Sequence, residues 1–427
     1  GSAGREGPIV QIGSALGSTV GQLFQLSDNR IRNLVACGSA AGIAATFHAP
    51  IAGVIFALEV ILGEFTLQHF STIVIAAVSA SVIGQAAFGD IPAFPIPPYH
   101  IESTWEFALF PFLGLLAAIV GLIFVRLLYG TEDIFDRLKR FPPWIKPAIG
   151  GALLGLLGFT YPFIFRIQWE QQPQFFNVGY DVIEGALTGK LLLGVILSLL
   201  FLKLLATPLT LGSGGSGGVF APSLFMGAML GSAFGIVVNA LFPGMTAPPG
   251  AYGLVGMGAV FSAVAHAPIT AVLIMFELTN DYRIILPLML TVGISTFIGH
   301  KLLQGESIYT VKLSRRGVRL RSGQDTDLMQ GVLVEEVMTS QIDAVRRTTT
   351  IGELSHIAQA TYHHGFPVID EDDNLWGIVT VPDLEGAFQG NLPRSTMVEE
   401  ICTPGERLLV CYPDENISAV LSRMGPR

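Results

Sequence analysis

From its start to about residue 310, the chain alternates apolar runs with short polar breaks, and beyond that point charged residues return at high density. We interpret the apolar runs as helices. The pattern places them at 8–24, 30–46, 50–62, 70–88, 105–138, 143–162, 179–188, 190–206, 220–242, 250–265, 269–279 and 284–304. Several are too short to cross about 30 Å of hydrocarbon at about 1.5 Å per residue. The run from Phe107 to Val125 is free of charge and long enough to span.

One interval gives the clearest sign of a membrane environment. Between Leu204 and Phe276 there is no Asp, Glu, Lys or Arg. This length exceeds the ~20 residues of one spanning helix, so it must hold several membrane segments, and its Gly and Pro content favours broken helices. Charged residues make up 13% of the chain, against about 25% in soluble proteins. We therefore expect an integral, multi-pass membrane protein.

The remaining composition excludes some partners. The net charge of −9 gives no indication of nucleic-acid binding. The chain has three cysteines, and their positions show neither metal-ligand spacing nor a disulfide framework. No metal site is expected.

The membrane part contains an internal repeat. GREGPIVQIGSALGSTVG at 4–21 matches GVFAPSLFMGAMLGSAFG at 218–235, with the glycines and the proline at identical spacing. GSAAGIAATFHAPIAGVIFALE at 38–59 then matches GMGAVFSAVAHAPITAVLIMFE at 256–277 without a gap. Two homologous halves are typical of transport proteins, whose site lies where the halves meet. Because the first copy has so little chain before it, we expect at least two or three further helices upstream.

Both copies begin with a loop of the form Gly-x-x-x-Pro that leads into a helix. Proline suits the first turn of a helix, and glycine lets the backbone approach a ligand. The free N–H groups of the first turn lie at the positive end of the helix dipole and bind anions. Two such ends meeting within a bilayer would hold a small anion without a full positive charge, as a conduit requires. By composition alone, GSGGSGGVFAP at 212–222 would also fit a flexible linker.

Glu6 is the ionisable residue of the first loop. A carboxylate at a helix N-terminus can serve as a simple cap, but inside a membrane an ionisable residue indicates function. Ionised, it would compete with an anion for the same N–H groups, and protonated it would leave them. Glu6 is therefore a candidate gate that responds to pH and to the anion. Arg5 is its local counter-charge or a polar anchor.

These residues resemble the CLC family of chloride channels and chloride/proton antiporters. Its second and third signature loops correspond to Gly4-Arg5-Glu6-Gly7-Pro8 and Gly218-Val219-Phe220-Ala221-Pro222. The resemblance implies an all-α membrane protein of two repeated halves with broken helices over residues 1–310, and a homodimer with one pathway per subunit. It also implies roles for single residues: Glu6 as the gating glutamate, Tyr309 as the inner cap of the anion, and Val219, Phe220, Gly7 and Gly218 as chloride-binding residues, with backbone N–H groups of the third loop as donors. The family's first loop, which carries an anion-binding serine, is expected before Gly1.

One departure from the family bears on mechanism. Antiporters of the family commonly carry a second glutamate on the helix after the HAP motif, and our alignment places Val60 at that position, one residue after Glu59. Valine cannot relay a proton. The sequence therefore favours passive, gated chloride conduction, with chloride/proton exchange on the same fold as the alternative. A regulated cation transporter would need carboxylates where the chain has none, and no constellation of catalytic residues indicates an enzyme. The repeat-related Glu59 and Glu277 are interpreted as structural partners near helix ends.

The charged C-terminal part resembles CBS domains. We expect a linker at 311–332, a first CBS domain at 333–391 and the start of a second at 395–427, where VEEICTP echoes VEEVMTS at 334–340. The α/β CBS region would be cytoplasmic, because the basic residues of the linker suit that side of the membrane. Some CBS pairs bind adenine nucleotides, and Thr380 and Asp383 lie where a ribose-binding aspartate is often found. The alternative is a dimerisation and gating module without a ligand, and His363 and His364 are interpreted as surface residues. No other cofactor is expected.

Overall fold

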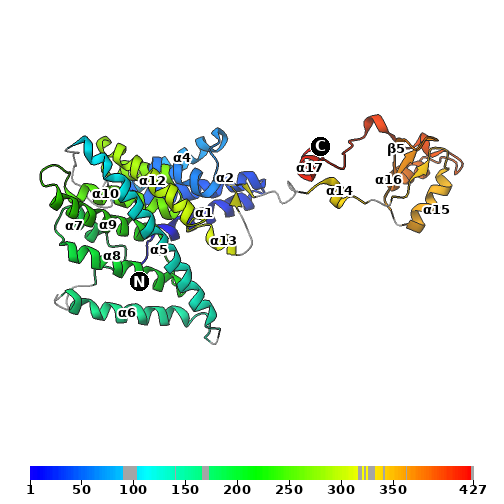
Figure 1. The fold of residues 1–427 in the computed structure, drawn as a ribbon. Coiled ribbons are helices and arrows are strands. Elements are labelled where there is room, and N and C mark those ends of the chain that lie inside the picture. The colour runs from blue at the N-terminus through cyan, green and yellow to red at the C-terminus, as the bar shows by residue number, and fades with distance from the viewer. Residues whose placement is uncertain are drawn as a thin grey trace. The chain divides into compact units, whose positions relative to one another are not determined.

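A computed structural model describes residues 1–89, 103–139, 141–165, 173–315, 320–321, 324–325, 332–339, 342–361 and 363–424. The chain divides into two compact units, Gly1–Asp325 and Thr326–Arg427, which we call the membrane unit and the C-terminal unit (Figure 1). Each is described by itself.

The membrane unit is almost entirely helical, as the apolar pattern predicted. Its helices are α1 (Glu6–Leu23), α2 (Asp28–Phe47), α3 (Pro50–Phe56), η1 (Ala57–Leu62), α4 (Leu67–Phe88), η2 (Thr104–Ala108), α5 (Phe110–Arg137), α6 (Lys146–Phe165), α7 (Tyr180–Leu187), α8 (Leu193–Gly212), α9 (Phe220–Leu241), α10 (Pro249–Ala265), α11 (Pro268–Thr279), η3 (Tyr282–Ile284), α12 (Ile285–Leu302) and α13 (Val311–Arg315). One short antiparallel pair, β1 (Leu320–Arg321) and β2 (Gln324–Asp325), follows.

Three segments of the membrane unit differ from the sequence expectation. The helix expected at 190–206 continues to Gly212 through Pro208, because proline removes a single backbone bond whereas unwinding within lipid would expose several. The helix expected at 50–62 changes at Ala57 from α-helix to the wider π-helix η1. Residues 311–315, placed in the expected linker, form α13, where Lys312 and Arg315 pair with acidic residues of α5.

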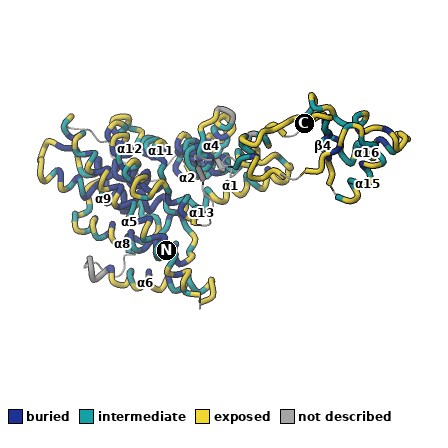
Figure 2. Tube along the Cα trace, turned by 45° about the vertical axis from the view of Figure 1, so that its right-hand side comes forward, coloured by how far each residue is buried: buried dark blue, intermediate teal, exposed yellow. Residues whose placement is uncertain are grey.

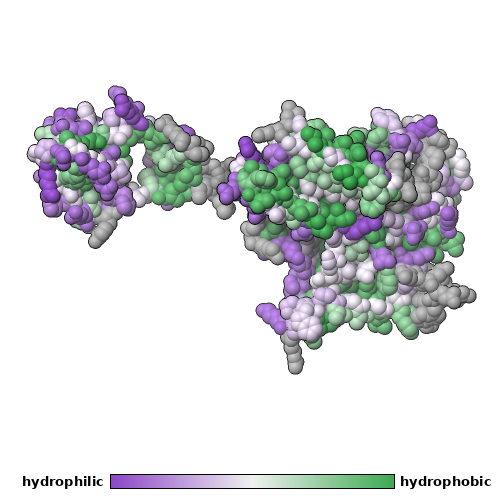
Figure 3. All heavy atoms as spheres, turned by 180° about the vertical axis from the view of Figure 1, so that it is seen from behind, coloured by the Kyte–Doolittle hydropathy of each residue, from purple (hydrophilic) through white to green (hydrophobic). Residues whose placement is uncertain are grey.

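Five helical segments among the described residues are long and apolar enough to span a membrane, and they lie at 69–88, 104–137, 193–212, 220–241 and 282–302. The apolar helices at Pro50–Leu62, Pro249–Ala265 and Pro268–Thr279 are shorter, as the sequence predicted for several of its helices. Many residues of α5, α9 and α10 are buried, and dark blue marks this around α5 and α9 in Figure 2. On the face drawn in Figure 3, apolar side chains form large areas of this unit's surface. These exposed side chains include Ile75 and Ile83 of α4 and Phe297 of α12.

Glycines allow the paired helices of each repeat to touch through their backbones. A Cβ atom on Gly13 of α1 would lie 2.2 Å from the carbonyl oxygen of Gly38 in α2. The equivalent pair in the second half is Gly227 of α9 and Gly256 of α10, where the same distance would be 2.3 Å. Such close backbone approach replaces the hydrophobic driving force that is missing between helices in lipid. Both halves are therefore assembled by the same contact.

The two halves also cap each other. The carboxylate of Glu59 accepts the N–H groups of Ile269 and Thr270 at the start of α11, at 3.1 and 2.8 Å. Its repeat partner Glu277 accepts the two N–H groups that follow Pro50 at the start of α3, at 2.9 and 2.6 Å. Each carboxylate satisfies N–H groups that a helix leaves unpaired at its start. These contacts give both glutamates a structural function at the junction of the halves.

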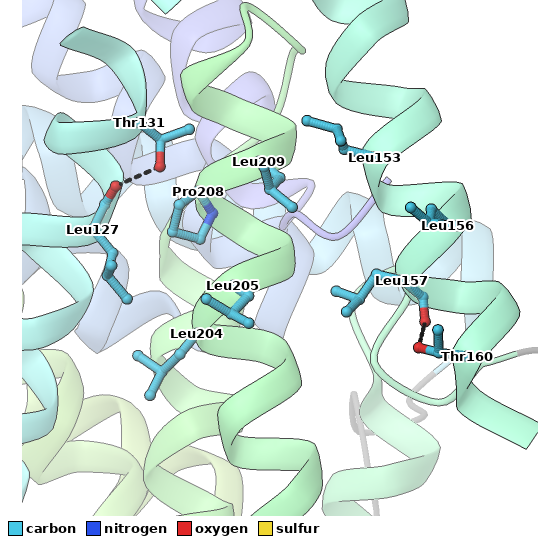
Figure 4. A pocket seen from close by; sticks show the side chains of 10 residues that line it. All are labelled: Leu127, Thr131, Leu153, Leu156, Leu157, Thr160, Leu204, Leu205, Pro208 and Leu209. Carbon is cyan, nitrogen blue, oxygen red and sulfur yellow. Dashed lines mark hydrogen bonds between the residues drawn. The ribbon is translucent and has the colours of Figure 1, made fainter. Parts of the chain in front are cut away.

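An apolar cavity of about 380 Å³ lies between α5, α6 and α8 (Figure 4). Leucines form most of its wall. Its two hydroxyl groups, on Thr131 and Thr160, donate to the carbonyl oxygens of Leu127 and Leu157. With its polar groups engaged in this way, the cavity has no chemistry for an ion.

The C-terminal unit is a small α/β unit, as predicted. Its elements are α14 (Val334–Val337), β3 (Val345–Arg346), α15 (Ile351–Thr361), β4 (Gly365–Ile369), β5 (Leu375–Thr380), α16 (Val381–Gln389), η5 (Val398–Glu400), β6 (Thr403–Pro404), η6 (Gly405–Arg407) and α17 (Ile417–Met424). The sheet has the order β3-β4-β5-β6, parallel in the first pair and antiparallel in the others. In the turn between β4 and β5, the N–H of Asn374 donates to Asp370 and holds the pKa of that carboxyl below its usual value.

The two VEE segments of the C-terminal unit make equivalent backbone hydrogen bonds. The N–H of Val334 donates to the carbonyl of Glu415 at 2.9 Å, and the N–H of Val398 donates to the carbonyl of Thr349 at 2.8 Å. Each segment thus pairs with the chain that enters the helix of the other copy, α17 or α15. This exchange supports the interpretation of residues 395–427 as part of a second, equivalent copy.

The helix contact through Gly13 yields a first prediction. Gly13→Ala forces a methyl group into the backbone of α2, so we expect the protein to lose about 1–3 kcal/mol of stability. Thermal unfolding in detergent measures this as a lowered midpoint. Gly293→Ala in α12 is the matched control, because no atom lies within 4 Å of its added Cβ. Equal midpoints for the two variants would contradict the packing argument.

Candidate anion site

A pair of hydrogen bonds joins the two signature loops. The N–H of Gly4 donates to the carbonyl of Gly218 at 2.8 Å, and the N–H of Gly218 donates back to Gly4 at 2.7 Å. A Cβ on Gly7 would lie 2.8 Å from the Cα of Gly218, so side chains are excluded where the loops cross. The bridge brings together the starts of α1 and α9, which lie far apart in the sequence but adjacent in the fold.

Three N–H groups at these helix starts have no protein partner among the described residues. Within the described part of the chain, the N–H groups of Gly7, Val219 and Phe220 donate to no backbone or side-chain acceptor. Unpaired N–H groups at a buried helix start require an acceptor from elsewhere. Here two sets of them converge at one bridge, an arrangement of backbone dipoles that is suited to an anion.

Glu6 lies at this site and is 1% exposed. Its Oε1 accepts a hydrogen bond from the hydroxyl of Tyr180 at 2.7 Å. Its Oε2 is buried without a hydrogen-bond partner among the described residues, and it lies against Gly4, where an added Cβ would be 2.2 Å away. A carboxylate that is buried and only half satisfied is held at a cost in free energy. This state makes Glu6 a candidate for the gate that the sequence predicted, and that function stays a prediction.

Arg5 is exposed, and its guanidinium lies 5.8 Å from the centre of the Tyr180 ring. Arg5 therefore lies near Glu6 by way of Tyr180, which contacts both residues. This position fits the counter-charge that the sequence suggested.

Tyr309 lies in the loop between α12 and α13, far from the signature loops in the sequence. Its ring meets that of Phe56 edge to face at 6.4 Å. The preceding residue, Ile308, donates its N–H to the carbonyl of Val264 at the end of α10 and accepts the hydroxyl of Tyr129. These bonds fix the loop that carries Tyr309. The N–H of Tyr309 donates to the hydroxyl of Ser307 at 3.3 Å and adds to this hold on the loop.

Phe220 forms an apolar wall beside its own N–H group. It is 3% exposed, and its ring packs against Phe47 at 5.1 Å and Phe261 at 4.5 Å. Such a wall excludes water and strengthens the interaction of an anion with the neighbouring N–H groups. The predicted residues Glu6, Gly7, Gly218, Val219 and Phe220 are thus brought together by one bridge, with Tyr309 on the side of α3.

Lys203 was missed by the sequence analysis. It lies in α8 and is 0% exposed, and its Nζ donates to the carbonyls of Phe175, Asn177 and Val178 at 3.2, 2.7 and 3.4 Å. It also lies 4.8 Å from the ring centre of Phe225. The available signal was a single charge inside an otherwise apolar helix, which indicates a function within a membrane.

Val60, at the position of the family's inner glutamate, is half-buried in the π-helix η1 and packs against the core of the membrane unit. Its neighbour Glu59 is engaged with the start of α11, as described above. The π-helix places that carboxylate on the α11 side, and its oxygens are occupied by N–H groups.

Thr380 and Asp383, the predicted nucleotide residues, bind each other at the start of α16. The Asp383 carboxylate accepts the N–H and the hydroxyl of Thr380 at 2.9 and 2.6 Å, and Thr380 accepts the N–H of Asp383 at 3.4 Å. This reciprocal capping stabilises the helix start. It accounts for both residues structurally, and a nucleotide at this position stays a prediction.

Comparison with known proteins identifies relatives of both units. Residues 1–300 match the family model described as voltage gated chloride channel, and residues 334–390 match the CBS domain. Chloride channel protein CLC-f of Arabidopsis thaliana is 32% identical, and the match covers 100% of this chain and 62% of that protein. The H⁺/Cl⁻ exchange transporter ClcA of Vibrio cholerae is 33% identical over 76% of this chain and 68% of its own length.

A solved structure agrees with these matches. The crystal structure of a slow cyanobacterial Cl⁻/H⁺ antiporter is similar with a TM-score of 0.63 and 28% identity, covering 74% of this chain and 72% of that one. Channels and exchangers are therefore both among the relatives.

The buried lysine yields the second prediction. Lys203→Met keeps the length of the side chain but leaves the carbonyl of Asn177 without this donor, so stability should fall by about 1–3 kcal/mol. The thermal midpoint of the purified protein measures the loss. Lys190→Met, at an exposed position, is the control and should leave the midpoint unchanged. A higher midpoint for Lys203→Met would show that the cost of burying the charge outweighs its bonds.

Proposed function

Because the chain belongs to the family of voltage-gated chloride channels, which transport chloride across membranes, we propose that it forms a gated, passive pathway for chloride. The observation that carries this proposal is the convergence of unpaired N–H groups from α1 and α9 at the Gly4–Gly218 bridge. Dipolar N–H groups bind a chloride ion less tightly than a full positive charge would, so the ion can leave again.

We propose that Glu6 is the gate of this pathway. Its ionised carboxylate occupies the region of positive potential at the start of α1 and excludes an anion of the same charge. Protonation removes the charge, and with it the attraction of the carboxylate to the N–H groups, so the side chain leaves and chloride enters. Chloride itself competes with Glu6 for the same position. Tyr309, whose ring lies beside Phe56, closes the site on its other side and offers a hydroxyl to the ion.

Val60 favours conduction over exchange. An exchanger must deliver protons to Glu6 from the far side of the membrane, and the apolar side chain of Val60 cannot bind or release a proton. Glu59 is bound to the start of α11. The relatives named above include exchangers as well as channels, so chloride/proton exchange is the second candidate, and the last prediction of this subsection separates the two.

We further propose that the C-terminal unit is a cytoplasmic regulatory CBS region and that the protein is a homodimer with one pathway in each subunit. Lys312 and Arg315 of α13 follow the last membrane helix and support the cytoplasmic orientation. The exchanged pairing of the two VEE segments supports a CBS pair as the regulatory unit.

The gate is tested by Glu6→Gln, which mimics permanent protonation. We expect chloride flux in this variant to be at least as high as in the wild type and to be independent of pH, because the residue can no longer acquire a charge. Uptake of radioactive chloride into liposomes containing the full-length protein, measured across a range of pH values, provides the readout. Glu184→Gln, at a half-buried position of α7 one turn beyond Tyr180, is the control. Retention of the wild-type pH profile by Glu6→Gln would exclude Glu6 as the gate.

Passive conduction is tested by the reversal potential. With opposed chloride and proton gradients across a planar bilayer, a channel should reverse at the chloride equilibrium potential whatever the pH difference. An exchanger would shift with the pH gradient at constant chloride. Such a shift would replace the channel assignment with the exchanger one while leaving the anion site intact.

A further inference from the structure

Glu6 receives a hydrogen bond from a side chain outside the signature loops. Tyr180, the first residue of α7, donates its hydroxyl to Oε1 of Glu6 at 2.7 Å. Neither the repeat nor the family motifs include Tyr180. The bond is made to a group that is itself buried, and hydrogen bonds to charged groups are about twice as strong as neutral ones. A donor in this place acts directly on the equilibrium of the gate.

The position of Tyr180 is set by a sharp turn. Gly179, which precedes it, has a positive φ of 84°, a conformation that favours glycine. A Cβ on Gly179 would also meet the ring of Phe225 in α9 at 2.7 Å. The turn directs the chain from the 175–178 segment into α7, so that the ring of Tyr180 reaches Glu6.

The 175–178 segment is fixed on two sides. Lys203 donates to three of its carbonyl groups, as described above. From the other side, Ser2 donates its hydroxyl to the carbonyl of Phe175 at 2.8 Å, and the N–H of Asn177 donates to the carbonyl of Gly1 at 2.8 Å. The segment therefore joins α8 to the residues directly before the first signature loop. Lys203 therefore fixes the segment from which Tyr180 extends toward Glu6.

We propose that Tyr180 is a positioning residue for the gate, whose hydroxyl holds the Glu6 carboxylate in the blocking position. The 175–178 segment, which Lys203 anchors, fixes the place from which Tyr180 extends. The inference rests on the proposed gating function of Glu6. Opening then requires two events, the loss of charge on Glu6 and the release of the Tyr180 hydroxyl. The strength of one hydrogen bond thereby sets the pH at which the pathway opens.

Other groups also act on Glu6, and the test must separate them from Tyr180. Arg5 lies beside the Tyr180 ring, Lys203 of α8 lies within electrostatic range of Glu6, and Tyr309 approaches from the loop before α13. Helix α9 carries no titratable side chain. Lys203 and Tyr309 are left in place when only the hydroxyl of Tyr180 is removed, whereas Arg5 also interacts with that hydroxyl.

The test is the pH profile of chloride flux through the full-length Tyr180→Phe protein in liposomes. Removing the hydroxyl destabilises the ionised, blocking form of Glu6, so protonation becomes easier. The sign of the effect is therefore an upward shift in the pH of half-maximal flux, by about one unit for a hydrogen bond to a charged group. At a pH above the wild-type midpoint, flux should rise up to about tenfold.

Two controls separate this effect from general damage to the fold. Tyr252→Phe is the matched variant, because it removes a hydroxyl that donates to another buried carboxylate, Glu106 Oε2 at 3.0 Å, and it should leave the pH midpoint unchanged. In the Glu6→Gln background, Tyr180→Phe should change flux no further, because the ionised carboxylate is already absent.

The possible results divide cleanly between the two proposals. A wild-type midpoint for Tyr180→Phe, together with pH-independent flux for Glu6→Gln, overturns the function of Tyr180 and leaves the gate intact. Equal fold-changes for Tyr180→Phe in the wild-type and Glu6→Gln backgrounds also overturn it, since the residue would then act on the pathway itself. A Glu6→Gln protein that retains the pH profile overturns both proposals.

Discussion

The bridge between Gly4 and Gly218 is the constraint on which the rest of the membrane unit depends. A pair of backbone hydrogen bonds holds two helix starts so close that only glycine fits where they cross. The first-turn N–H groups of α1 and α9 are then directed at a common region, and neither helix can satisfy the groups of the other. Removing these groups from water is unfavourable unless an acceptor is supplied. The fold thus creates a need for an anion, which either chloride or a carboxylate can meet.

Backbone symmetry around this bridge is maintained by contacts that are themselves symmetric. The glycine pairs Gly13–Gly38 and Gly227–Gly256 bring each first helix of a repeat against its second. Glu59 and Glu277 then connect the halves, because each accepts N–H groups at a helix start in the other half. The broken helices α3 and α11 leave such groups unpaired within an apolar environment, and the exchanged carboxylates satisfy them. A single unbroken helix in place of α3 or α11 would have no unpaired N–H groups there. It would therefore not bind a glutamate of the other half.

Much of this could be predicted from the sequence because the determinants are local or repeated. Repeated glycine spacing predicted the pairing of the halves, and Gly-x-x-x-Pro predicted a helix start with free N–H groups. The long-range contacts were not predictable in this way. Nothing near Tyr180 in the sequence indicates that its hydroxyl reaches Glu6, and the partners of Lys203 are backbone carbonyls, which have no sequence signature. Thr380 and Asp383 show a different problem, because one local pattern allows two interpretations. Their residue types suggested a ligand, while their spacing of three residues is also that of a helix cap.

The function of the site depends on the place where the repeat departs from symmetry. Glu6 and Phe220 occupy equivalent positions after the two bridging glycines, so one backbone geometry presents a carboxylate in the first half and an apolar ring in the second. Two carboxylates facing each other here would repel, and one of them would be protonated at neutral pH. Two apolar rings would leave the N–H groups permanently open to an anion. One carboxylate opposite one apolar wall gives a site that a single charge can close, and the bond from Tyr180 then acts on that charge alone. The asymmetry of two side chains on a symmetric backbone is therefore what turns an anion-binding fold into a gate.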